Sequence, residues 1–461
     1  MNKKYYITSA IPYVNANPHI GHAQEFIYSD VIRRYYQLLN KDVIYLSGAD
    51  ENALKIVQAA EDSGKSIQEF CDIHNQEFLD LAARLNVHLD IWQRATDKKR
   101  HFLASQKLWL LCQKNDDIYK KIYTGLYCVG CETFYASDEL NDKGECFEHP
   151  GKKLDKVSEE NYFFRLSRYQ KFLEDLISSN KLEVIPNIRK NEVLAFVKRG
   201  LDDFSISRSR QRAKNWGVPV PEDQNQIMYV WFDALNIYQS GIGFGWDWKT
   251  YKKLWPQDVM VIGKGIIRFH AVYWPAILKS AGLELPKVLF VHGYLTVNGQ
   301  KMSKTLGNVV DPVKIVEKYS TDSLRYYLLR EIPSYADGDF SERRFKELYN
   351  ADLANGLGNL VARLAKLAQG KSYQPKIASY QQLTNQYSYF KKALDEFRFN
   401  DALAFVWEKV AATNKRIDEK KPWDLDGEKL NKVLWPLIGQ ILEISTLLQP
   451  FLPETSKKIL T

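Results

Sequence analysis

The sequence is short of cysteine and has no long uninterrupted hydrophobic run. Five cysteines in 461 residues are too few for a protein stapled by disulfides, and none of the apolar stretches is long enough to cross a bilayer. Internal repeats and low-complexity tracts are also missing. The first residues, Met1 to Lys4 followed by Tyr5-Tyr6-Ile7-Thr8, carry no small-residue cleavage site of a signal peptide. These absences predict a globular protein of the reducing cytoplasm, without a membrane segment.

The charge balance and the aromatic content are compatible with several kinds of partner and select none. The chain carries 64 Lys and Arg residues against 56 Asp and Glu residues, a net charge of +8. That charge suits a polyanion such as nucleic acid but does not require one. The 27 Tyr, 22 Phe and 11 Trp side chains can stack on bases or fill a core equally well. The choice between these roles depends on motifs.

Strands alternate with helices in parts of the chain, which predicts a parallel, Rossmann-like sheet in an α/β domain. The expected strands cover residues 4–10, 43–47, 258–262 and 287–291, and the apolar spacing over 23–39 predicts a helix after the first strand. Each strand ends in a turn that contains Gly, His, Asp or Asn. Since ligands of parallel sheets bind beyond the carboxyl ends of the strands, we expect the functional site at these turns.

Two other regions depart from this alternating pattern. A long insertion, about residues 112–224, separates the second and third expected strands and contains an extended stretch at 161–166. From about residue 345 the apolar residues follow helical spacing throughout, as at Leu353, Leu357 and Leu360. The second pattern predicts an all-α bundle after the α/β domain.

The tetrapeptide His19-Ile20-Gly21-His22 lies between the first expected strand and the first helix. A helix N-terminus directs backbone N–H groups and the positive end of its dipole at whatever lies there, which suits phosphate. Gly21 allows a ligand to approach the backbone, and two imidazoles can donate hydrogen bonds to phosphate oxygens. Taken alone, these four residues fit a turn whose histidines cap the helix just as well.

A second motif, Lys301-Met302-Ser303-Lys304-Thr305, lies between Gly299 and Gly307. Two lysines and two hydroxyl groups on a glycine-flanked loop can close over a triphosphate and stabilise the charge that develops during its reaction. The alternative is a solvated basic loop. Because the two motifs lie in distant parts of the chain, their joint occurrence indicates more than either motif alone.

Together, the two motifs resemble the signature sequences of class I aminoacyl-tRNA synthetases, and the surrounding sequence is similar to the methionyl-tRNA synthetase family in particular. The resemblance covers essentially the whole chain and includes Ala10-Ile11-Pro12-Tyr13, Tyr229-Val230-Trp231-Phe232-Asp233-Ala234, Arg268-Phe269-His270-Ala271-Val272-Tyr273-Trp274-Pro275 and Val291-His292-Gly293-Tyr294-Leu295. It implies ligation of L-methionine to tRNA(Met), including the initiator tRNA, through a methionyl-adenylate formed from ATP with Mg²⁺. The implied ATP-binding residues are His19, Gly21, His22, Lys301, Ser303 and Lys304, of which His19, His22, Lys301 and Lys304 are the implied catalytic residues.

Three cysteines and a histidine are arranged as two paired knuckles, Cys128-x2-Cys131 and Cys146-x2-His149. Three thiolates and one imidazole fill the tetrahedral coordination sphere of Zn²⁺ and leave no position for water, so we expect one structural zinc ion per chain. Buried thiols without a metal explain the doubled spacing poorly. The resemblance agrees, because the family's connective insertion carries such a knuckle here. Cys71 and Cys112 fall on helix-like stretches and are expected in the core.

The resemblance also implies a pocket for the methionine side chain. A thioether is apolar and polarisable, so its site should be lined by aromatic groups with a few polar anchors. The implied residues are Ile11, Tyr13, Trp231, Ala234, Leu235, Tyr238, Ile266 and His270, with Asp50 pairing with the substrate's α-amino group. On spacing alone, Trp231 and Tyr238 fit plain core packing and His270 a structural role.

The helical tail is where the resemblance places anticodon recognition. The implied residues are Asn359, Arg363, Pro422 and Trp423. Asn359 and Arg363 are four positions apart, so they share one helix face. A Trp side chain can stack on an unpaired base while Asn and Arg hydrogen-bond to base edges, as in the recognition of single-stranded RNA loops. A buried Trp and an exposed polar helix face form the alternative.

The sequence departs from the family pattern at a few positions. The usual Asp-Glu-His-Gly after the second strand is Asp50-Glu51-Asn52-Ala53 here, and the usual Gly-Lys-Asp is Gly263-Lys264-Gly265. We expect these changes to affect substrate affinity more than reaction type.

The family's further domain that makes some relatives dimers is missing, which favours a monomer. The implied domains are a catalytic domain (1–111 and 225–294), a zinc-knuckle insertion (112–224), a lysine-loop junction (295–345) and an anticodon-binding domain (346–461).

Three other functions remain as alternatives. A class I synthetase for another apolar amino acid is the nearest, although leucine, isoleucine and valine enzymes usually carry an editing domain that this length cannot hold. A non-catalytic RNA-binding relative has no need of the histidine and lysine motifs. A nucleotidyltransferase that acts on small molecules would not need Asn359, Arg363 and Trp423.

Overall fold

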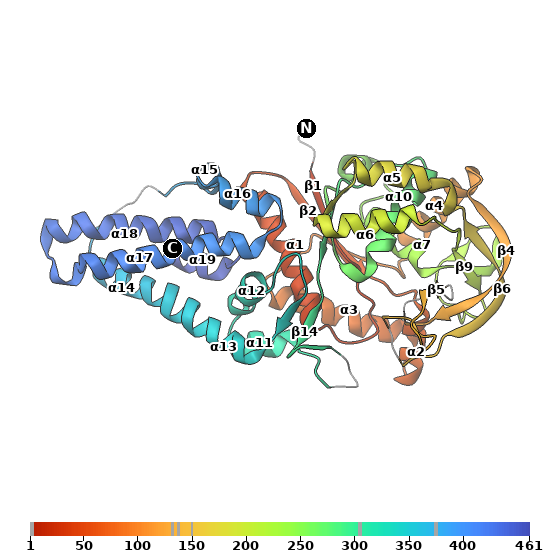
Figure 1. Ribbon diagram of the computed structural model, residues 1–461, viewed down its shortest axis with the longest axis horizontal. Helices are drawn as coiled ribbons and strands as arrows, with labels where there is room; N and C mark the ends of the chain where they lie inside the picture. Colours follow the sequence, from red (N-terminus) through yellow and green to blue (C-terminus); the bar gives the residue numbers. More distant parts are fainter. Residues whose placement is uncertain (1–3, 131–132, 136–138, 149–150, 303–306, 373–376) are drawn as a thin grey trace. The chain divides into compact units, whose positions relative to one another are not determined.

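The computed structural model describes residues 4–130, 133–135, 139–148, 151–302, 307–372 and 377–461 (Figure 1). The chain divides into two compact units. The first unit comprises Met1–Asn17, Ile44–Asp80 and Leu89–Val291, and the second comprises Pro18–Val43, Leu81–His88 and His292–Thr461.

The first unit is built on a six-stranded sheet. Its strands, in spatial order, are β3 (Ile91–Arg94), β2 (Val43–Ala49), β1 (Tyr5–Ser9), β12 (Val259–Gly263), β13 (Val288–His292) and β7 (Glu183–Ile185). The pairs β1–β12, β2–β3 and β13–β7 are parallel. The side chains from Val259 to Ile262 are fully buried, as in parallel sheets covered on both faces. The predicted Rossmann-like α/β fold is therefore confirmed, with all four expected strands in one sheet.

Two strands of this sheet were not expected from the sequence. β3 and β7 are short, and β7 comes from within the insertion predicted at 112–224. The helices of the first unit include α2 (Leu54–Asp62), α3 (Ile67–Arg84, whose last turn belongs to the second unit), α4 (His101–Lys114), α5 (Gln170–Ser178), α6 (Asn187–Lys198) and α10 (Trp274–Ser280).

The insertion forms a second, antiparallel sheet of four strands. The long strands β4 (Ile118–Cys128) and β6 (Asp155–Phe164) pair along their whole length and lie side by side in Figure 1, flanked by β5 (Thr133–Tyr135) and β8 (Phe204–Ser205). The extended stretch expected at 161–166 is the end of β6. A third small sheet consists of β9 (Ser207–Ser209), β10 (Pro219–Val220) and β11 (Asp223–Met228).

Short helices connect β11 with the later strands and carry much of the predicted methionine site. They are α7 (Val230–Ala234), α8 (Ile237–Ser240), α9 (Trp248–Leu254), a 3₁₀ turn at Lys264–Ile266 and a π-helical turn at Phe269–Tyr273. Gly48 on β2 has no space for a side chain, because a Cβ atom there would lie 2.1 Å from the carbonyl oxygen of Gln93. The glycine thus allows β2 and β3 to approach closely just before the turn at Asp50.

The second unit joins helix α1 (Ile20–Leu38) to the carboxyl-terminal half of the chain. Asp30 of α1 forms a fully buried ion pair with Arg325, 2.8 Å from oxygen to nitrogen. Arg325 also donates to the backbone oxygens of Leu85, Pro450 and Phe451. A buried guanidinium needs several acceptors to offset the loss of water, so this arginine holds three distant stretches of chain together.

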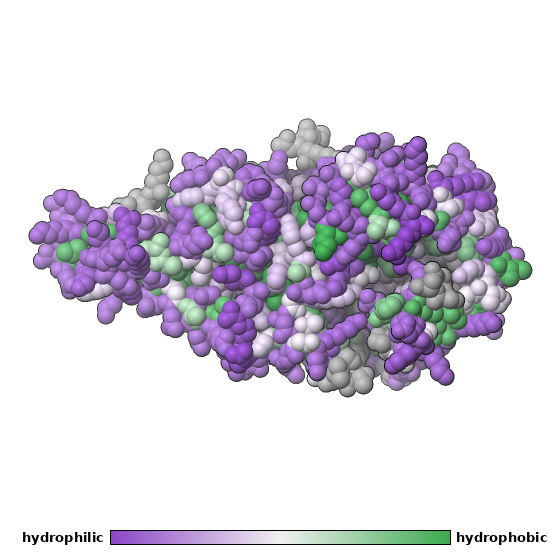
Figure 2. Space-filling model, viewed as in Figure 1, coloured by the Kyte–Doolittle hydropathy of each residue, from purple (hydrophilic) through white to green (hydrophobic). Residues whose placement is uncertain are grey.

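The tail of the second unit is a helical bundle, as predicted. It contains α13 (Glu342–Leu348), a π-helical stretch (Tyr349–Gly358), α14 (Asn359–Ala368), α15 (Tyr380–Gln386), α16 (Ser388–Asp395), α17 (Phe399–Lys420), α18 (Gly427–Leu448) and α19 (Pro453–Leu460). Before it lie α11 (Pro312–Lys318), α12 (Thr321–Arg330) and a small sheet of β14 (Leu295–Val297), β15 (Gln300–Lys301) and β16 (Gly338–Phe340). Figure 1 shows α14, α17 and α18 side by side, and their outer surface is mainly hydrophilic on the face in Figure 2.

Among the residues that the structure describes, no helix has the length and the apolar character needed to cross a membrane.

Candidate functional site

The carboxyl end of β2 lies beside the turn that follows β1. Asp50 donates its backbone N–H to the carbonyl oxygen of Pro12 at 3.0 Å, and Tyr13 and Asp50 form a single parallel bridge. The Asp50 side chain is almost completely buried, with 2% of it exposed. Ile11 and Tyr13 are half-buried on the same turn. Three residues of the predicted methionine site thus meet where two neighbouring strands end.

An aromatic group completes this part of the first unit. The ring of Trp231 stacks on that of Phe269 with centroids 3.8 Å apart and planes 4° from parallel. The edge contacts of Trp231 are with Tyr13, at 6.2 Å and 87°, and with His270, at 6.3 Å and 83°. These four rings form an aromatic wall whose members come from three separate stretches of the sequence: Tyr13, Trp231, Phe269 and His270. Each ring contacts at least one other ring, which fixes its plane.

The hydrogen bonds of His270 determine which of its nitrogens carries the proton. Nδ1 lies 2.9 Å from the carbonyl oxygen of Ile266, which can only accept, so Nδ1 donates. Nε2 then accepts from the hydroxyl group of Tyr238 at 2.8 Å. Desolvation by burial lowers the pKa of His270 to about 4. At neutral pH this side chain is an uncharged acceptor with a fixed orientation.

The other residues of the predicted methionine site lie on the adjoining short helices. Ala234 and Leu235 are buried at the end of α7, and Ile266 is half-buried on the 3₁₀ turn. All nine residues assigned to methionine binding therefore belong to the first unit.

The N-terminus of α1, in the second unit, is capped by its own two histidines. His19 is the N-cap residue, and its Nδ1 accepts from the N–H of Gly21 at 3.1 Å. The backbone N–H of His19 donates to Nδ1 of His22, also at 3.1 Å. The two rings stack, with centroids 3.9 Å apart. Since Nδ1 is an acceptor in both rings, the proton of each neutral imidazole is on Nε2, where it can be donated.

Gly21 is required by this arrangement. A Cβ atom at this position would lie 2.9 Å from Cε1 of His19, too close for a real side chain. Desolvation by burial lowers the pKa of His19 to about 4 and lowers that of His22, where the neighbouring His19 adds to the effect. Both rings are therefore neutral donors at pH 7. The capping role considered as an alternative is real, and it engages Nδ1 of each ring rather than Nε2.

The lysine loop is only partly within the described residues. Lys301 ends β15 with an exposed side chain, and its carbonyl oxygen accepts from Nδ2 of Asn308 at 3.1 Å. Ser303, Lys304 and Thr305 lie outside the described part of the chain.

Two of the four predicted zinc ligands are described. Cys128 and Cys146 are both buried, and their sulfur atoms are 3.3 Å apart. A disulfide would require about 2.05 Å, whereas two thiolates on one tetrahedral Zn²⁺ lie about 3.8 Å apart. The separation is thus longer than a disulfide and shorter than that of two thiolates on one zinc ion. Cys131 and His149 lie outside the described residues, and no group of three metal-binding side chains occurs among the residues that are described.

Two of the predicted anticodon residues, Arg363 and Trp423, contact each other in the helical bundle. Arg363 of α14 places its guanidinium 5.2 Å from the ring centroid of Trp423 and donates to Oδ1 of Asp418 at 2.7 Å. Asn359 is exposed at the first position of α14, and Pro422 is buried in the turn that presents Trp423. Trp423 is 49% exposed. The alternative of a buried Trp is therefore wrong, and its ring is accessible to a base.

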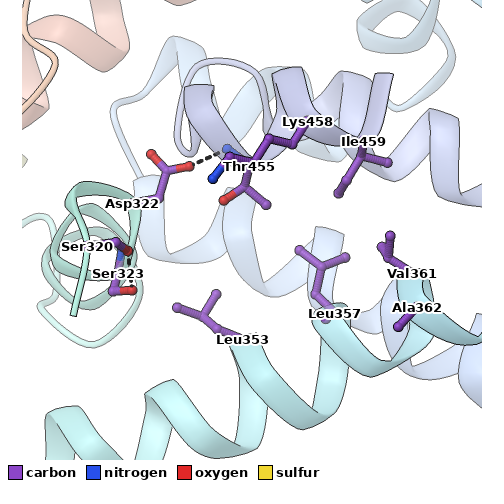
Figure 3. A pocket seen from close by; sticks show the side chains of 11 residues that line it. Ser320, Asp322, Ser323, Leu353, Leu357, Val361, Ala362, Thr455, Lys458 and Ile459 are labelled. Atoms are coloured by element: carbon purple, nitrogen blue, oxygen red, sulfur yellow. Dashed lines mark hydrogen bonds between the residues drawn. The ribbon is translucent and has the colours of Figure 1, made fainter. Parts of the chain in front are cut away.

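A cavity of about 340 Å³ lies elsewhere in the second unit (Figure 3). Residues of α12, of the π-helical stretch Tyr349–Gly358, of α14 and of α19 line it, among them Asp322, Leu357 and Thr455. Asp322 accepts a hydrogen bond from the backbone N–H of Thr455 at 2.6 Å. None of the residues predicted for substrate or anticodon binding lines this cavity.

Several buried polar residues near Asp50 were missed by sequence reasoning. Nδ2 of Asn52 donates to Oδ2 of Asp233 at 2.5 Å, and Oδ2 of Asp233 is 3.6 Å from Nε2 of His101. In the sequence, Asn52 is visible only as a departure from the family pattern, and Asp233 only as part of a matching stretch. Their separation in the sequence hid the contact, but a carboxylate within an apolar stretch is a signal that could have found it.

Another missed contact lies in the second unit. His292, within one of the matching stretches, donates from Nδ1 to the carbonyl oxygen of Gly293 at 2.8 Å and has Nε2 3.1 Å from Oε2 of Glu25. Glu25 is on the first turns of α1, so the contact joins this helix to His292 within the second unit.

Comparisons with known proteins point in one direction. A family model described as "tRNA synthetases class I (M)" matches residues 5–365. The methionine–tRNA ligase of Thermotoga maritima is 41% identical, over 99% of this chain and 74% of the relative. That of Brucella suis biovar 1 is 40% identical, over 99% and 91%. The structure of Mycobacterium tuberculosis methionyl-tRNA synthetase in complex with methionyl-adenylate is similar at a TM-score of 0.92 and 38% identity, covering 99% of this chain and 93% of that one.

Proposed function

Since the chain belongs to the class I tRNA synthetases, in the family of the methionine–tRNA ligases, we propose that it ligates L-methionine to tRNA(Met) at the expense of ATP. Besides the family match, one observation supports methionine as the amino acid. The buried carboxylate of Asp50 and the enclosed rings of Trp231, Tyr238 and neutral His270 offer one anionic anchor within an otherwise apolar, aromatic site. An amino acid with a long, uncharged, polarisable side chain fits that combination.

The first step joins methionine to AMP. A carboxylate oxygen of methionine attacks the α-phosphorus of ATP, the bond from that phosphorus to the bridging oxygen breaks, and pyrophosphate leaves. Asp50 holds the ammonium group of methionine. The Nε2 protons of His19 and His22, with the dipole of α1, stabilise the charge on the phosphates. Lys301, Ser303 and Lys304 bind the part of ATP that leaves as pyrophosphate. Mg²⁺ bound to ATP would neutralise part of the charge on its phosphates.

The second step transfers methionine to tRNA. A hydroxyl group of the terminal ribose attacks the carbonyl carbon of the adenylate, and the bond from that carbon to the phosphate oxygen breaks. AMP leaves with the bonding electrons, and the hydroxyl proton is released to solvent. Neither step needs a covalent bond to the protein, so catalysis consists of positioning and charge stabilisation. The methionine residues belong to the first unit and the phosphate residues to the second.

The insertion holds one structural zinc ion in this proposal. Its ligands are Cys128, Cys131, Cys146 and His149, and the near-contact of the two described sulfur atoms supports them. With four protein ligands the metal has no position for substrate, so it stabilises the knuckle and takes no part in the chemistry. Metal analysis should give about one zinc per chain, and a value near zero would contradict this assignment.

In this proposal, the helical bundle of the tail recognises tRNA(Met), including the initiator tRNA. Trp423 stacks on an anticodon base, and Asn359 and Arg363 hydrogen-bond to base edges. The exposure of Trp423 and the guanidinium at its ring support this role.

We propose the same domain division that the sequence predicts. It consists of a catalytic domain (1–111 and 225–294), an insertion (112–224), a lysine-loop junction (295–345) and an anticodon-binding domain (346–461).

We also infer a monomer, which light scattering would test against the chain mass of 53.6 kDa. The cytoplasm is the proposed compartment, because the three zinc-binding cysteines must stay reduced.

The direct test is ATP–pyrophosphate exchange with each of the twenty amino acids. We expect exchange with methionine and background rates with the others. Exchange with leucine, isoleucine or valine instead would keep the class and overturn the pocket assignment. A lack of exchange with every amino acid, in a protein that still binds tRNA(Met), would favour a non-catalytic RNA-binding function.

A further inference from the structure

The turn after β2 is held rigidly on both sides of Asp50. The next residue, Glu51, is completely buried, and its carboxylate accepts from Arg94 at 2.6 Å and from the hydroxyl group of Thr96 at 2.6 Å. Its carbonyl oxygen accepts from Nε1 of Trp216 at 2.7 Å. With this many partners, the backbone of the turn has little freedom, and what remains to be fixed is the direction of the side chains.

Asn52 connects this turn to the helix that carries part of the methionine site. Its backbone N–H donates to Oδ1 of Asp50 at 3.4 Å, and its Nδ2 donates to Oδ2 of Asp233 at 2.5 Å. Asp233 lies in α7 between Trp231 and Ala234. One residue therefore bonds both to the carboxylate assigned to the substrate ammonium and to the helix that presents the aromatic wall.

The orientation of the Asn52 amide is determined by its partners. Nδ2 also donates to the carbonyl oxygen of Ala95 at 3.2 Å. If the amide were reversed, its oxygen would face a carboxylate and a carbonyl oxygen, both of which can only accept. Asn52 must therefore be the donor and Asp233 the acceptor. The contact is almost free of water, because 5% of Asn52 and none of Asp233 is exposed.

The far side of Asp233 is also occupied. His101 is completely buried, with Nδ1 2.9 Å from the hydroxyl oxygen of Ser240 and Nε2 3.6 Å from Oδ2 of Asp233. Oδ1 of Asn52 and Oδ1 of Asp233, by contrast, have no hydrogen-bond partner among the described residues. With the carboxylate of Asp50, they make the turn rich in acceptor oxygens. Such a surplus favours a cationic group such as an ammonium.

We propose that Asn52 is a positioning residue that acts through Asp50. Its hydrogen bond to Asp233 fixes the turn against α7 and so sets the direction from which Asp50 meets the ammonium group of methionine. The inference rests on the proposed function. It predicts that disturbing the Asn52–Asp233 pair raises KM for methionine much more than it lowers kcat, because the pair orients the substrate and does not touch the reacting phosphorus.

A reciprocal exchange of the two side chains tests this inference. Asn52→Asp places two carboxylates in contact, and we expect KM for methionine in ATP–pyrophosphate exchange to rise about 30-fold, with kcat within about threefold. The double variant N52D/D233N restores one donor and one acceptor in reversed order. We expect it to bring KM back to within about fivefold of the unsubstituted protein.

The matched control is Asn161→Asp. Asn161 of β6 is also fully buried, lacks a partner for its Oδ1 and donates to a carboxylate, Glu159, at 3.3 Å. We expect this change to lower the thermal unfolding midpoint without moving KM for methionine. If Asn52→Asp does not fold, Asn52→Ala replaces it, with an expected rise of about tenfold in KM.

Three results would overturn the inference: an unchanged KM in Asn52→Asp or Asn52→Ala, an equal rise in Asn161→Asp, or a double variant no better than Asn52→Asp. A failure of the proposed function would look different, because the unsubstituted protein itself would then show no methionine-dependent exchange.

Discussion

Two tryptophans, one in each unit, show how differently the two predicted binding sites are built. Trp231 is 8% exposed and lies flat on Phe269, whereas Trp423 is 49% exposed and has the guanidinium of Arg363 beside its ring. A small apolar ligand gains most from a site that excludes water, and a base in an RNA loop can be reached only by a ring that remains at the surface. The same residue type thus serves opposite requirements.

The comparison implies that stability and binding are coupled in one site and separate in the other. In the amino-acid site, the side chains that would contact methionine are also part of the hydrophobic core. In the predicted anticodon site, Asn359 and Trp423 are exposed and contribute less to the core. The following variants test that difference.

Replacing Trp231 by alanine should have the largest effect. The loss of a stacked, buried ring is expected to lower the free energy of unfolding by about 3–5 kcal/mol and to abolish measurable methionine activation. Denaturant unfolding and ATP–pyrophosphate exchange measure the two effects. Trp231→Phe is the control, with a smaller loss in both. Normal stability in Trp231→Ala would contradict the coupling.

Replacing Asp50 by asparagine should remove the anionic anchor while preserving the shape of the site. We expect kcat/KM for methionine to fall at least about 100-fold, because a buried charge-assisted hydrogen bond is worth about 3 kcal/mol. Exchange kinetics give the value, and tRNA binding should be unchanged. A loss below about fivefold would remove Asp50 from the site.

Replacing Trp423 by alanine should affect only the reaction with tRNA. Loss of stacking on one base costs about 1–3 kcal/mol, so aminoacylation is expected to fall by about 5- to 150-fold in kcat/KM for tRNA(Met). Exchange without tRNA and the unfolding midpoint should both stay within error. A matching loss of exchange would mean that Trp423 supports the fold.

The pH dependence of stability should reveal the neutral state of His270. Because burial holds its pKa in the folded protein at about 4, below the unfolded value of about 6.5, the unfolded state takes up the proton first as the pH falls. Stability is therefore complete above pH 6.5 and decreases toward pH 4. Between pH 7 and pH 5, this group should account for about 2 kcal/mol. Urea unfolding at both pH values tests this, and His270→Gln should reduce the difference by that amount; an unreduced difference would contradict the assignment.

The smallest effect is expected from Asp418→Asn. The ion pair between Asp418 and Arg363 is largely exposed to solvent, and such pairs contribute about 0–1 kcal/mol. KM for tRNA(Met) should change by less than about fivefold, measured in the same aminoacylation assay. A loss as large as that of Trp423→Ala would show that the pair, and not the ring alone, presents the site.

The parts of this structure that sequence patterns predict are those determined locally. The four expected strands are continuous apolar runs, and their predicted bounds agree with the structure within a few residues; the helical character of the tail follows from the spacing of its leucines. β7, with three residues inside a long insertion, has no such local signal. The segment becomes a strand because it pairs with β13, at the edge of the sheet.

The candidate functional site was also predictable only where local sequence patterns exist. The resemblance implied roles for His19, Asp50 and Trp231, but the sequence could not show that His19 and His22 together cap α1. The Asn52–Asp233 contact joins positions 181 residues apart. Hydrogen bonds of this kind depend on the tertiary fold, and single residues carry no pattern that would indicate them.

The most direct test of the account is aminoacylation of an unfractionated tRNA pool with each radiolabelled amino acid in turn. The account predicts that methionine alone becomes attached, that the charged species are tRNA(Met), and that label is lost when ATP is omitted. Attachment of any other amino acid, or of methionine to other tRNAs at a comparable rate, would contradict it.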